Sequence, residues 1–332
     1  MRLFITAVPL LCCAFAVPAA ASPHEPTTEQ PAAQQQAGTR QATVLQGGVA
    51  RWSGADAREC GIFGKRYAAL DGTCYYPVDM KAKPGTHEVA LYDAAGKGHT
   101  GSLVVEEREC TETEITLDKL EYIDVSAENR ARAAKERTAV DAAVKGAPDV
   151  HPRFTLPLGK PAAGAGVKDR SDFCEKRIYN GKVRSFHTGL DYLIGTGNPV
   201  VAPADGTVTL AADHFFAGNT VVVDHGGGLI TMAFHLNDIA VTEGAQVKKG
   251  DKIGTVGETG RTTGPHLHFG ARWQNQRIDA AALLGDPSKL PGIGEPEAGG
   301  DAPDVDAVEA DAATPATEDR AGEDDNSAVK DD

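Results

Sequence analysis

Short runs in which apolar and polar residues alternate, separated by glycine, aspartate and proline, occupy most of this 332-residue chain. Alternation with a period of two is typical of β-strands that bury one face. Between residues 43 and 117 the runs include TVLQGGVARW, GTCYYPV, HEVALYD and GSLVVEE. Their short, irregular spacing predicts a small β-sandwich as an N-terminal domain over residues 42–120.

A second set of such runs extends from about residue 153 to residue 283 and includes PVVAPADGTVTLAAD, NTVVVDHGGGLITMAFHL, VKKGDKIGTVG and PHLHFGARW. Pairs such as Gly-Gly, Asp-Gly and Lys-Gly mark turns between them. No long amphipathic helical segment interrupts the series. We therefore expect an antiparallel β-sheet domain over residues 151–290, in a protein that is mainly β.

One segment between these two regions has a strong helical pattern. Ser126 is a candidate N-cap, Glu128 falls in the first turn, and alanine dominates as far as Val144. A glycine and a proline end the pattern by residue 148. Because its charges alternate in sign, we expect a solvated helix in a linker that spans residues 121–150.

Both ends of the chain lack a core-forming pattern. Residues 1–21 have the features of a secretory signal peptide: one arginine, an apolar run from Leu3 to Val17, and small residues before a cleavage site at Ser22. Residues 22–41 predict a disordered linker and residues 291–332 an acidic disordered tail. No later segment approaches the ~18 apolar residues of a membrane-spanning helix. We expect an exported protein, periplasmic or secreted, without stable membrane insertion.

The net charge of −14 is concentrated in the tail. Residues 295–332 carry 14 acidic and 2 basic side chains, which leaves a net charge of −2 for the rest of the chain. A nearly neutral folded region does not favour nucleic-acid binding.

Two of the six cysteines lie in the predicted signal peptide, and four follow it. An even number in an exported protein predicts two disulfides, with three possible connectivities. A bridge between Cys60 and Cys74 is the most local option. Pairing of Cys110 with Cys174 would clamp the two domains together.

The motif GRTTGPHLHFG contains two histidines at alternate positions. On a β-strand the side chains of His266 and His268 project from one face, while Leu267 points to the other, which we expect to be the core. Two imidazoles on an open face suit a metal ligand with a catalytic neighbour, although a pair of this kind also occurs by chance on surfaces.

The motif HTGLD adds a histidine and a carboxylate. On a regular strand His187 and Asp191 would share a face but lie roughly 13 Å apart. A bend at Gly189 could bring both onto one ion. With His268 they make two imidazoles and one carboxylate, a set that leaves a fourth zinc position for water. The prediction is one Zn²⁺ per chain.

Two further histidines are candidates for proton handling and oxyanion stabilisation, His266 and His235. Regular alternation places His235 on the face of Ala233 and Thr231, opposite Phe234, unless a bulge intervenes. Taken singly, each candidate also suits a surface turn or a strand end. The combination favours a site.

Several segments are shared, in the same order, with a known family: RIYNGKVRSFHTGLDY, GNPVVAPADGTV, GNTVVVDHGGGLITMAFHL and VKKGDKIGTVGETGRTTGPHLHFG. From about Pro157 to Leu283 the chain resembles the lysostaphin/LytM-type zinc metallopeptidases. The region 44–117 and the following helix resemble, more loosely, the β-domain that often precedes such catalytic domains. One departure is Phe173-Cys174, where relatives usually have Phe-Gly, and it concerns the shape of the entry loop.

The resemblance implies a fold and a set of roles. The catalytic domain is expected to place a groove across its β-sheet and to cleave peptide bonds of bacterial peptidoglycan. The residues that match the family's zinc ligands are His187, Asp191 and His268, and those that match its catalytic histidines are His235 and His266.

Three functions are compatible with these residues. The first is a zinc-dependent endopeptidase that hydrolyses stem-peptide cross-links of peptidoglycan by a metal-activated water. The second is a non-catalytic LytM-like activator of a cell-wall amidase, and the third is a secreted lytic or elastolytic protease with a pro-domain at residues 42–145. Because such activators have typically lost metal ligands, the presence of all five site residues favours the endopeptidase.

Overall fold

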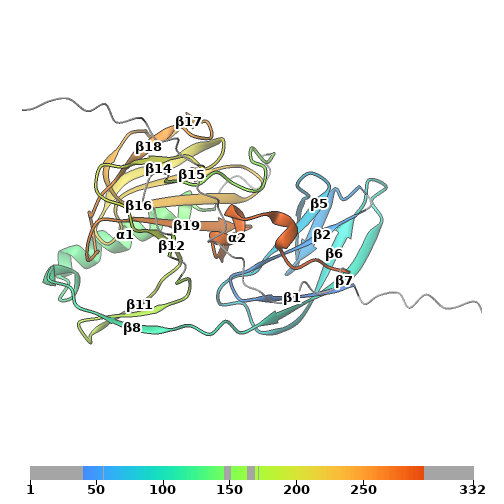
Figure 1. The fold of residues 1–332 in the computed structure, drawn as a ribbon, viewed down its shortest axis with the longest axis horizontal. Helices are drawn as coiled ribbons and strands as arrows, with labels where there is room; N and C mark the ends of the chain where they lie inside the picture. Colours follow the sequence, from blue (N-terminus) through green and yellow to red (C-terminus); the bar gives the residue numbers. More distant parts are fainter. Residues whose placement is uncertain (1–39, 55, 146–150, 163–168, 171, 295–332) are drawn as a thin grey trace, which may run out of the picture. The chain divides into compact units, whose positions relative to one another are not determined.

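The computed structural model describes residues 40–54, 56–145, 151–162, 169–170 and 172–294 (Figure 1). The predicted signal peptide, most of the predicted linker at residues 22–41, and the predicted tail beyond residue 294 lie outside the described residues. Within the described residues, no helix is long and apolar enough to cross a membrane. The fold is mainly β, which confirms the fold class expected from the alternating pattern.

Residues 41–106 form two sheets around a shared core. The larger sheet contains, in spatial order, β1 (Gln41–Leu45), β7 (Gly98–Glu106), β6 (Gly85–Tyr92), β3 (Glu59–Ile62) and β4 (Lys65–Ala68). The smaller sheet pairs β2 (Val49–Ser53) with β5 (Thr73–Pro77). Trp52, Tyr76 and Leu103 are buried between them. Ile293, from the predicted tail, is buried in the same core.

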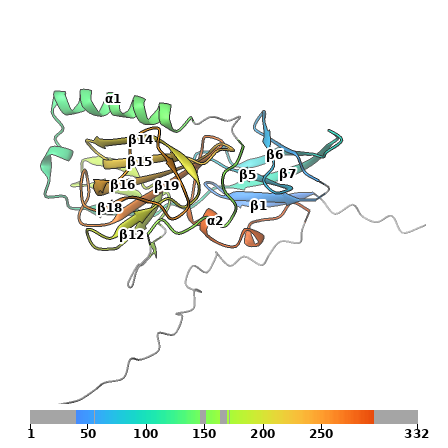
Figure 2. The ribbon, with the colours of Figure 1, turned by 90° about the horizontal axis from the view of Figure 1, so that it is seen from above.

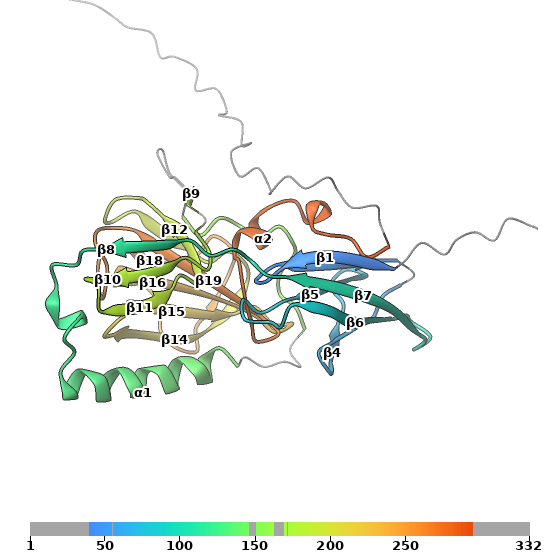
Figure 3. The same ribbon diagram turned by 90° about the horizontal axis from the view of Figure 1, so that it is seen from below.

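The next strand leaves this core and joins another sheet. β8 (Glu112–Ile115) pairs in parallel with β10 (Lys176–Tyr179), which pairs in turn with β11 (Val183–Phe186). Figure 3 shows the three strands side by side. β8 lies within residues 42–120, which were predicted to form the N-terminal domain. It therefore adds a strand to the small sheet whose other two strands, β10 and β11, directly precede HTGLD.

Helix α1 (Ala127–Ala143) follows a short 3-10 helix at Leu120–Tyr122. The Ser126 side chain accepts a hydrogen bond from the Asn129 amide at 3.1 Å, so Ser126 is the N-cap that the sequence predicts. None of the helical residues is buried. Figure 2 shows the helix alongside β14. Val144, the residue after the helix, is buried against apolar side chains of the large sheet.

The large sheet has ten strands, and every neighbouring pair in it is antiparallel, as expected. Its main path is β17 (Gln246–Val247), β14 (Gly206–His214), β15 (Gly218–Asp224), β16 (Leu229–Ile239), β19 (Leu267–Trp273), β12 (Gly189–Tyr192) and β9 (Asp169–Arg170). The remaining strands are β13 (Pro199–Val201), β18 (Lys252–Val256) and β20 (Gln276–Ile278), and the chain then forms α2 (Ala281–Leu284) and a 3-10 turn at Pro287–Lys289.

Alternation along β12 and β19 fixes which face carries polar groups. Leu190 and Tyr192 on β12, and Leu267 and Phe269 on β19, are buried in the main apolar core of the sheet. The residues between them therefore point to the opposite face. Burial of Leu267 confirms its predicted direction.

The structure contains two disulfides, Cys60–Cys74 and Cys110–Cys174. The predicted number of disulfides is therefore confirmed, and the pairing is one of the three connectivities that the sequence left open. The first lies within the sandwich. The second joins the segment before β8 to the segment before β10.

Candidate functional site

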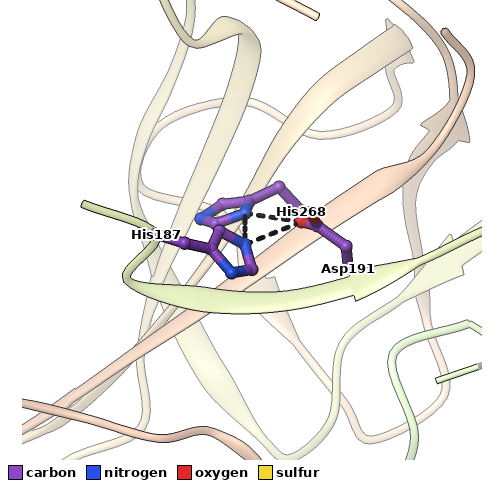
Figure 4. Close-up of side chains that lie close together, drawn as sticks. All are labelled: His187, Asp191 and His268. Atoms are coloured by element: carbon purple, nitrogen blue, oxygen red, sulfur yellow. Dashed lines mark hydrogen bonds and ion pairs between the residues drawn. The ribbon is translucent and has the colours of Figure 1, made fainter. Parts of the chain in front are cut away.

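The side chains of His187, Asp191 and His268 point toward a single location (Figure 4). Asp191 on β12 is paired across the sheet with His268 on β19, and His187 immediately precedes β12. His268 Nδ1 lies 2.8 Å from Asp191 Oδ1. His187 Nε2 lies 3.0 Å from that oxygen and 2.9 Å from His268 Nδ1. The three predicted ligands thus come together, with donor atoms close enough to hold one metal ion.

The backbone reaches this arrangement by a route that differs from the predicted one. The chain turns at His187 and Thr188, between β11 and β12, and Gly189 lies within a regular strand opposite Gly270. Gly189 is required for space: a Cβ there would lie 2.5 Å from the carbonyl oxygen of Phe269 and 2.8 Å from His268 Nε2. The prediction that Gly189 supplies the bend is wrong, although the two ligands do meet.

A second group of charges orients His187. Its Nδ1 faces Asp172, at 2.5 Å from Oδ1 and 3.2 Å from the carbonyl oxygen, so Nδ1–H donates to Asp172 and Nε2 is the nitrogen that points into the site. Arg177 donates to Asp172 at 2.7 Å, Glu175 at 2.7 Å and Asp191 at 2.9 Å. Carboxylates that hold the far nitrogen of a ligating histidine are a usual feature of metal sites.

The electrostatics favour positive charge where the three donor atoms meet. Burial acts to raise the pKa of Asp191, but hydrogen bonds from His187 and His268 outweigh it and hold the pKa well below its ordinary value. Burial acts to lower the pKa of His187, but the carboxylates of Asp172 and Asp191 raise it to about 9. Burial lowers the pKa of His268. Two ionised carboxylates thus stabilise a cation in a partly dry site.

His235 lines the same groove, but not by the predicted alternation. Ala233 and Thr231 are buried, so the face on which the sequence placed His235 belongs to the core. A register shift between β15 and β16 accompanies a φ of +60° at His235, and this bulge turns the ring into the groove. Phe234 lies beside it, with its ring centroid 5.3 Å from that of His268. The predicted face is therefore wrong.

His235 and His266 are held in the same way, each by a backbone carbonyl. Nδ1 of His235 donates to the carbonyl of Thr259 at 2.9 Å, and Nδ1 of His266 donates to that of Gly264 at 2.9 Å. Their ring centroids are 4.9 Å apart. With Nδ1 as the donor to the backbone, Nε2 is the ring nitrogen left for contact with a substrate, and that of His266 lies 3.8 Å from Asp191 Oδ1. Burial, followed by the nearby imidazoles, lowers the pKa of His235 to about 3.

The groove has a volume of about 440 Å³, and part of its wall comes from β8. Thr113 and Ile115 line it, and the Thr113 hydroxyl donates to Glu175 Oε1 at 2.6 Å. The Cys110–Cys174 disulfide fastens this strand to the entry loop. Cys174 has a φ of +72°, in the left-handed region that glycine favours, so the Phe-Gly of the resembled family suits this backbone conformation.

Sequence reasoning did not single out most other residues that line the groove, among them Asp172, Arg177, Tyr179, Phe216 and Arg261. Arg261 lies inside the motif that was singled out for its histidines, so attention to its charge would have identified it. No spacing distinguishes the others from ordinary charged and aromatic residues, because their contacts with the site depend on tertiary structure.

Comparison with known proteins places these motifs in a family. The family model described as Peptidase family M23 matches residues 185–280. Over 83 residues the chain is 45% identical to the peptidoglycan DD-endopeptidase ShyA of Vibrio cholerae. Over 97 residues it is 42% identical to the DD-carboxypeptidase/endopeptidase Mpg of Neisseria meningitidis. These alignments cover 25% and 29% of this chain but only 19% and 22% of the two relatives, about a fifth of their length.

A more extensive likeness comes from a crystal structure of a Pseudomonas aeruginosa protein that is described as a peptidase M23. It is 30% identical to this chain and superposes with a TM-score of 0.56. The alignment covers 73% of this chain and 95% of that protein. The predicted resemblance to lysostaphin/LytM-type peptidases is thereby confirmed, and the chain belongs to peptidase family M23.

Proposed function

We propose that the protein is a zinc-dependent endopeptidase that hydrolyses stem-peptide cross-links of bacterial cell-wall peptidoglycan. The observation that carries this proposal is the convergence of His187, Asp191 and His268 in a groove that also contains His235 and His266. The names of the aligned relatives, peptidoglycan DD-endopeptidase and DD-carboxypeptidase/endopeptidase, support the substrate class.

The donor set fits zinc. Two imidazoles and one carboxylate are a usual protein ligand set for catalytic zinc, and bond lengths of about 2.0–2.1 Å to tetrahedral zinc separate the ligand atoms by roughly 3.3 Å. The three donor atoms are 2.8–3.0 Å apart, so an opening of a few tenths of an ångström accommodates the ion. His187, Asp191 and His268 would hold it and leave one position facing the groove.

The proposed chemistry divides between the ion and the chain. Zinc bound here supplies a Lewis acid that polarises a carbonyl and lowers the pKa of water to about 7. His266 Nε2, close to the ligand set, is placed to accept the proton of the attacking water. His235 Nε2 faces the same groove and, once protonated, can donate to the developing oxyanion or the leaving nitrogen. The carbonyls at both Nδ1 atoms stabilise the protonated rings.

We further propose that residues 151–290 form the peptidase domain and that the protein acts in the periplasm or after secretion. The linker and the sandwich at residues 42–120 would support the domain through β8. The role of amidase activator is not favoured, because the complete ligand set is present and its donor atoms converge.

Digestion of purified sacculi tests the function. The full exported chain should bind one zinc and release muropeptides whose masses correspond to cleaved peptide cross-links. His268→Ala should lose both zinc and activity, whereas His99→Ala, which removes a histidine paired with Asp93 on the sandwich, should keep both. Release of sugar chains with intact cross-links, or full zinc occupancy in His268→Ala, would contradict the proposal.

A further inference from the structure

Two arginines line the groove, and their surroundings differ. Arg177 is neutralised by Asp172, Glu175 and Asp191, all within 2.9 Å. Arg261 lies in the same groove, but among the residues that the structure describes no carboxylate lies within 4.0 Å of its guanidinium. The groove therefore contains one cation that is compensated by the protein and one that is not.

The guanidinium of Arg261 is fixed by aromatic rings. Its central carbon lies 4.5 Å from the ring centroid of Tyr179 and 5.1 Å from that of Phe216. Such contacts use the face of the guanidinium and leave the N–H groups at its edge available. One of them donates to Ser185 Oγ at 3.3 Å. Arginine has five N–H donors, so this long contact uses a small part of its capacity.

The backbone ties Arg261 to the turn that also holds His235. The amide of Arg261 donates to the carbonyl of Phe216 at 2.9 Å, and the amide of His235 donates to the carbonyl of the next residue, Ala217, at 2.9 Å. His235 Nδ1 in turn donates to Thr259, two residues before Arg261. The arginine and the histidine are thus placed by the same two segments, and their relative position is fixed before any substrate binds.

The position of Arg261 is electrostatically unfavourable without an anion. Burial lowers its pKa, Tyr179 acts in the opposite direction, and the neighbouring Arg177 lowers it further. A charge that is partly withdrawn from water without a counter-ion raises the free energy of the protein. An anionic ligand would relieve this cost, and a planar carboxylate can accept two parallel N–H groups from a guanidinium.

We propose that Arg261, held between Tyr179 and Phe216, forms a subsite that binds a free carboxylate of the peptide substrate. The inference rests on the proposed endopeptidase function and specifies its substrate: a peptide that carries a free carboxylate near the scissile bond. Arg261 selects and positions this substrate, while the histidines act on the bond itself.

Paired peptides test the subsite. One synthetic cross-linked stem peptide retains its free carboxylates, and the other carries carboxamides in their place. The wild-type protein should cleave the first with a kcat/KM about 10–100-fold higher, the range for a hydrogen bond to a charged group. Arg261→Gln should lose this preference by slowing only the carboxylate peptide, and Arg261→Lys should retain part of it, because it keeps the charge but not the planar fork.

Two further measurements make the result unambiguous. Lys182→Gln removes one positive charge from the β10–β11 turn, where Lys182 pairs with Asp124, and should keep the full preference. Calorimetry measures the binding of both peptides to the inactive His268→Ala variant. This variant should bind the carboxylate peptide more tightly than the carboxamide peptide, and adding Arg261→Gln should abolish the difference. Cleavage of neither peptide by the wild type would refute the proposed function, while the calorimetry would still decide the subsite. Equal treatment of the two peptides, or equal slowing of both in Arg261→Gln, overturns the subsite.

Discussion

Replacement of Asp172 by alanine tests whether the charges behind His187 organise the metal site. The carboxylate lies 2.5 Å from His187 Nδ1, and the Asp172 carbonyl lies 3.2 Å from the same nitrogen. The substitution removes the first contact and keeps the second. His187 should therefore retain its tautomer but lose much of its fixed orientation and basicity.

The expected loss can be bounded. Removing a partner of this kind from a ligating histidine typically weakens metal binding about 10–100-fold. This corresponds to about 1.4–2.8 kcal/mol. Because the Asp172 carbonyl still faces Nδ1, and Arg177 still has Glu175 and Asp191 as partners, we expect the lower part of this range. The fold should persist, since the variant leaves no buried cation without a counter-ion.

Zinc affinity is measured by competition with a chromophoric chelator for the wild type and Asp172→Ala. The control is Asp93→Ala, which removes a carboxylate paired with His99 at 3.1 Å, outside the groove, and should leave zinc affinity unchanged. A dissociation constant for Asp172→Ala within threefold of the wild-type value would show that His187 is oriented without Asp172, and the reasoning would be wrong.

Three other predictions concern separate parts of the chain. His235→Ala and His266→Ala should each keep one zinc but lower muropeptide release about 10²–10³-fold or more, and near-normal cleavage by both would remove their assigned roles. Reduction of Cys110–Cys174, or replacement of both cysteines by serine, should lower the free energy of unfolding by roughly 4 kcal/mol, because the bridge closes a separation of 64 residues. Zinc binding should also weaken, and an unchanged denaturant midpoint would contradict the prediction. Burial lowers the pKa of His225 to about 4, so the stabilising effect of the neutral ring is complete above pH 6.5 and is lost as the pH falls to 4. The loss should be on the order of 3 kcal/mol. It is measured as the difference in unfolding free energy between the wild type and His225→Gln at pH 6.5 and at pH 4.

The sequence predicted those parts of the site that depend on local spacing. His268 and Leu267 point to opposite faces because strand alternation is a local property of the backbone. The meeting of His187 with Asp191 was also expected, but the turn that achieves it lies before Gly189. The glycine is needed for the close approach of β19, a contact between segments about 80 residues apart that no local pattern contains.

The orientation of His235 shows where alternation fails. Its strand reads as a regular apolar run, so the pattern places His235 with Ala233 and Thr231. The bulge depends on the pairing of β15 with β16 and on the amide of His235 reaching Ala217. These are interactions between strands, and a positive φ is uncommon at any residue other than glycine, so the alternating pattern does not indicate it.

The contribution of β8 to the groove follows from the way the entry loop is supported. The family model begins at residue 185, yet Asp172, which orients His187, precedes it. The strand that follows Asp172 is β10, whose two neighbours are β11 and β8. A two-stranded hairpin is marginally stable in water, whereas a third strand and a covalent tie reduce its freedom to open. The parallel pairing with β8 and the Cys110–Cys174 bridge supply both. The segment between the sandwich and the helix is thus part of the structure that holds His187, the first of the proposed metal ligands. This gives the region before the proposed peptidase domain a physical role in the proposed activity.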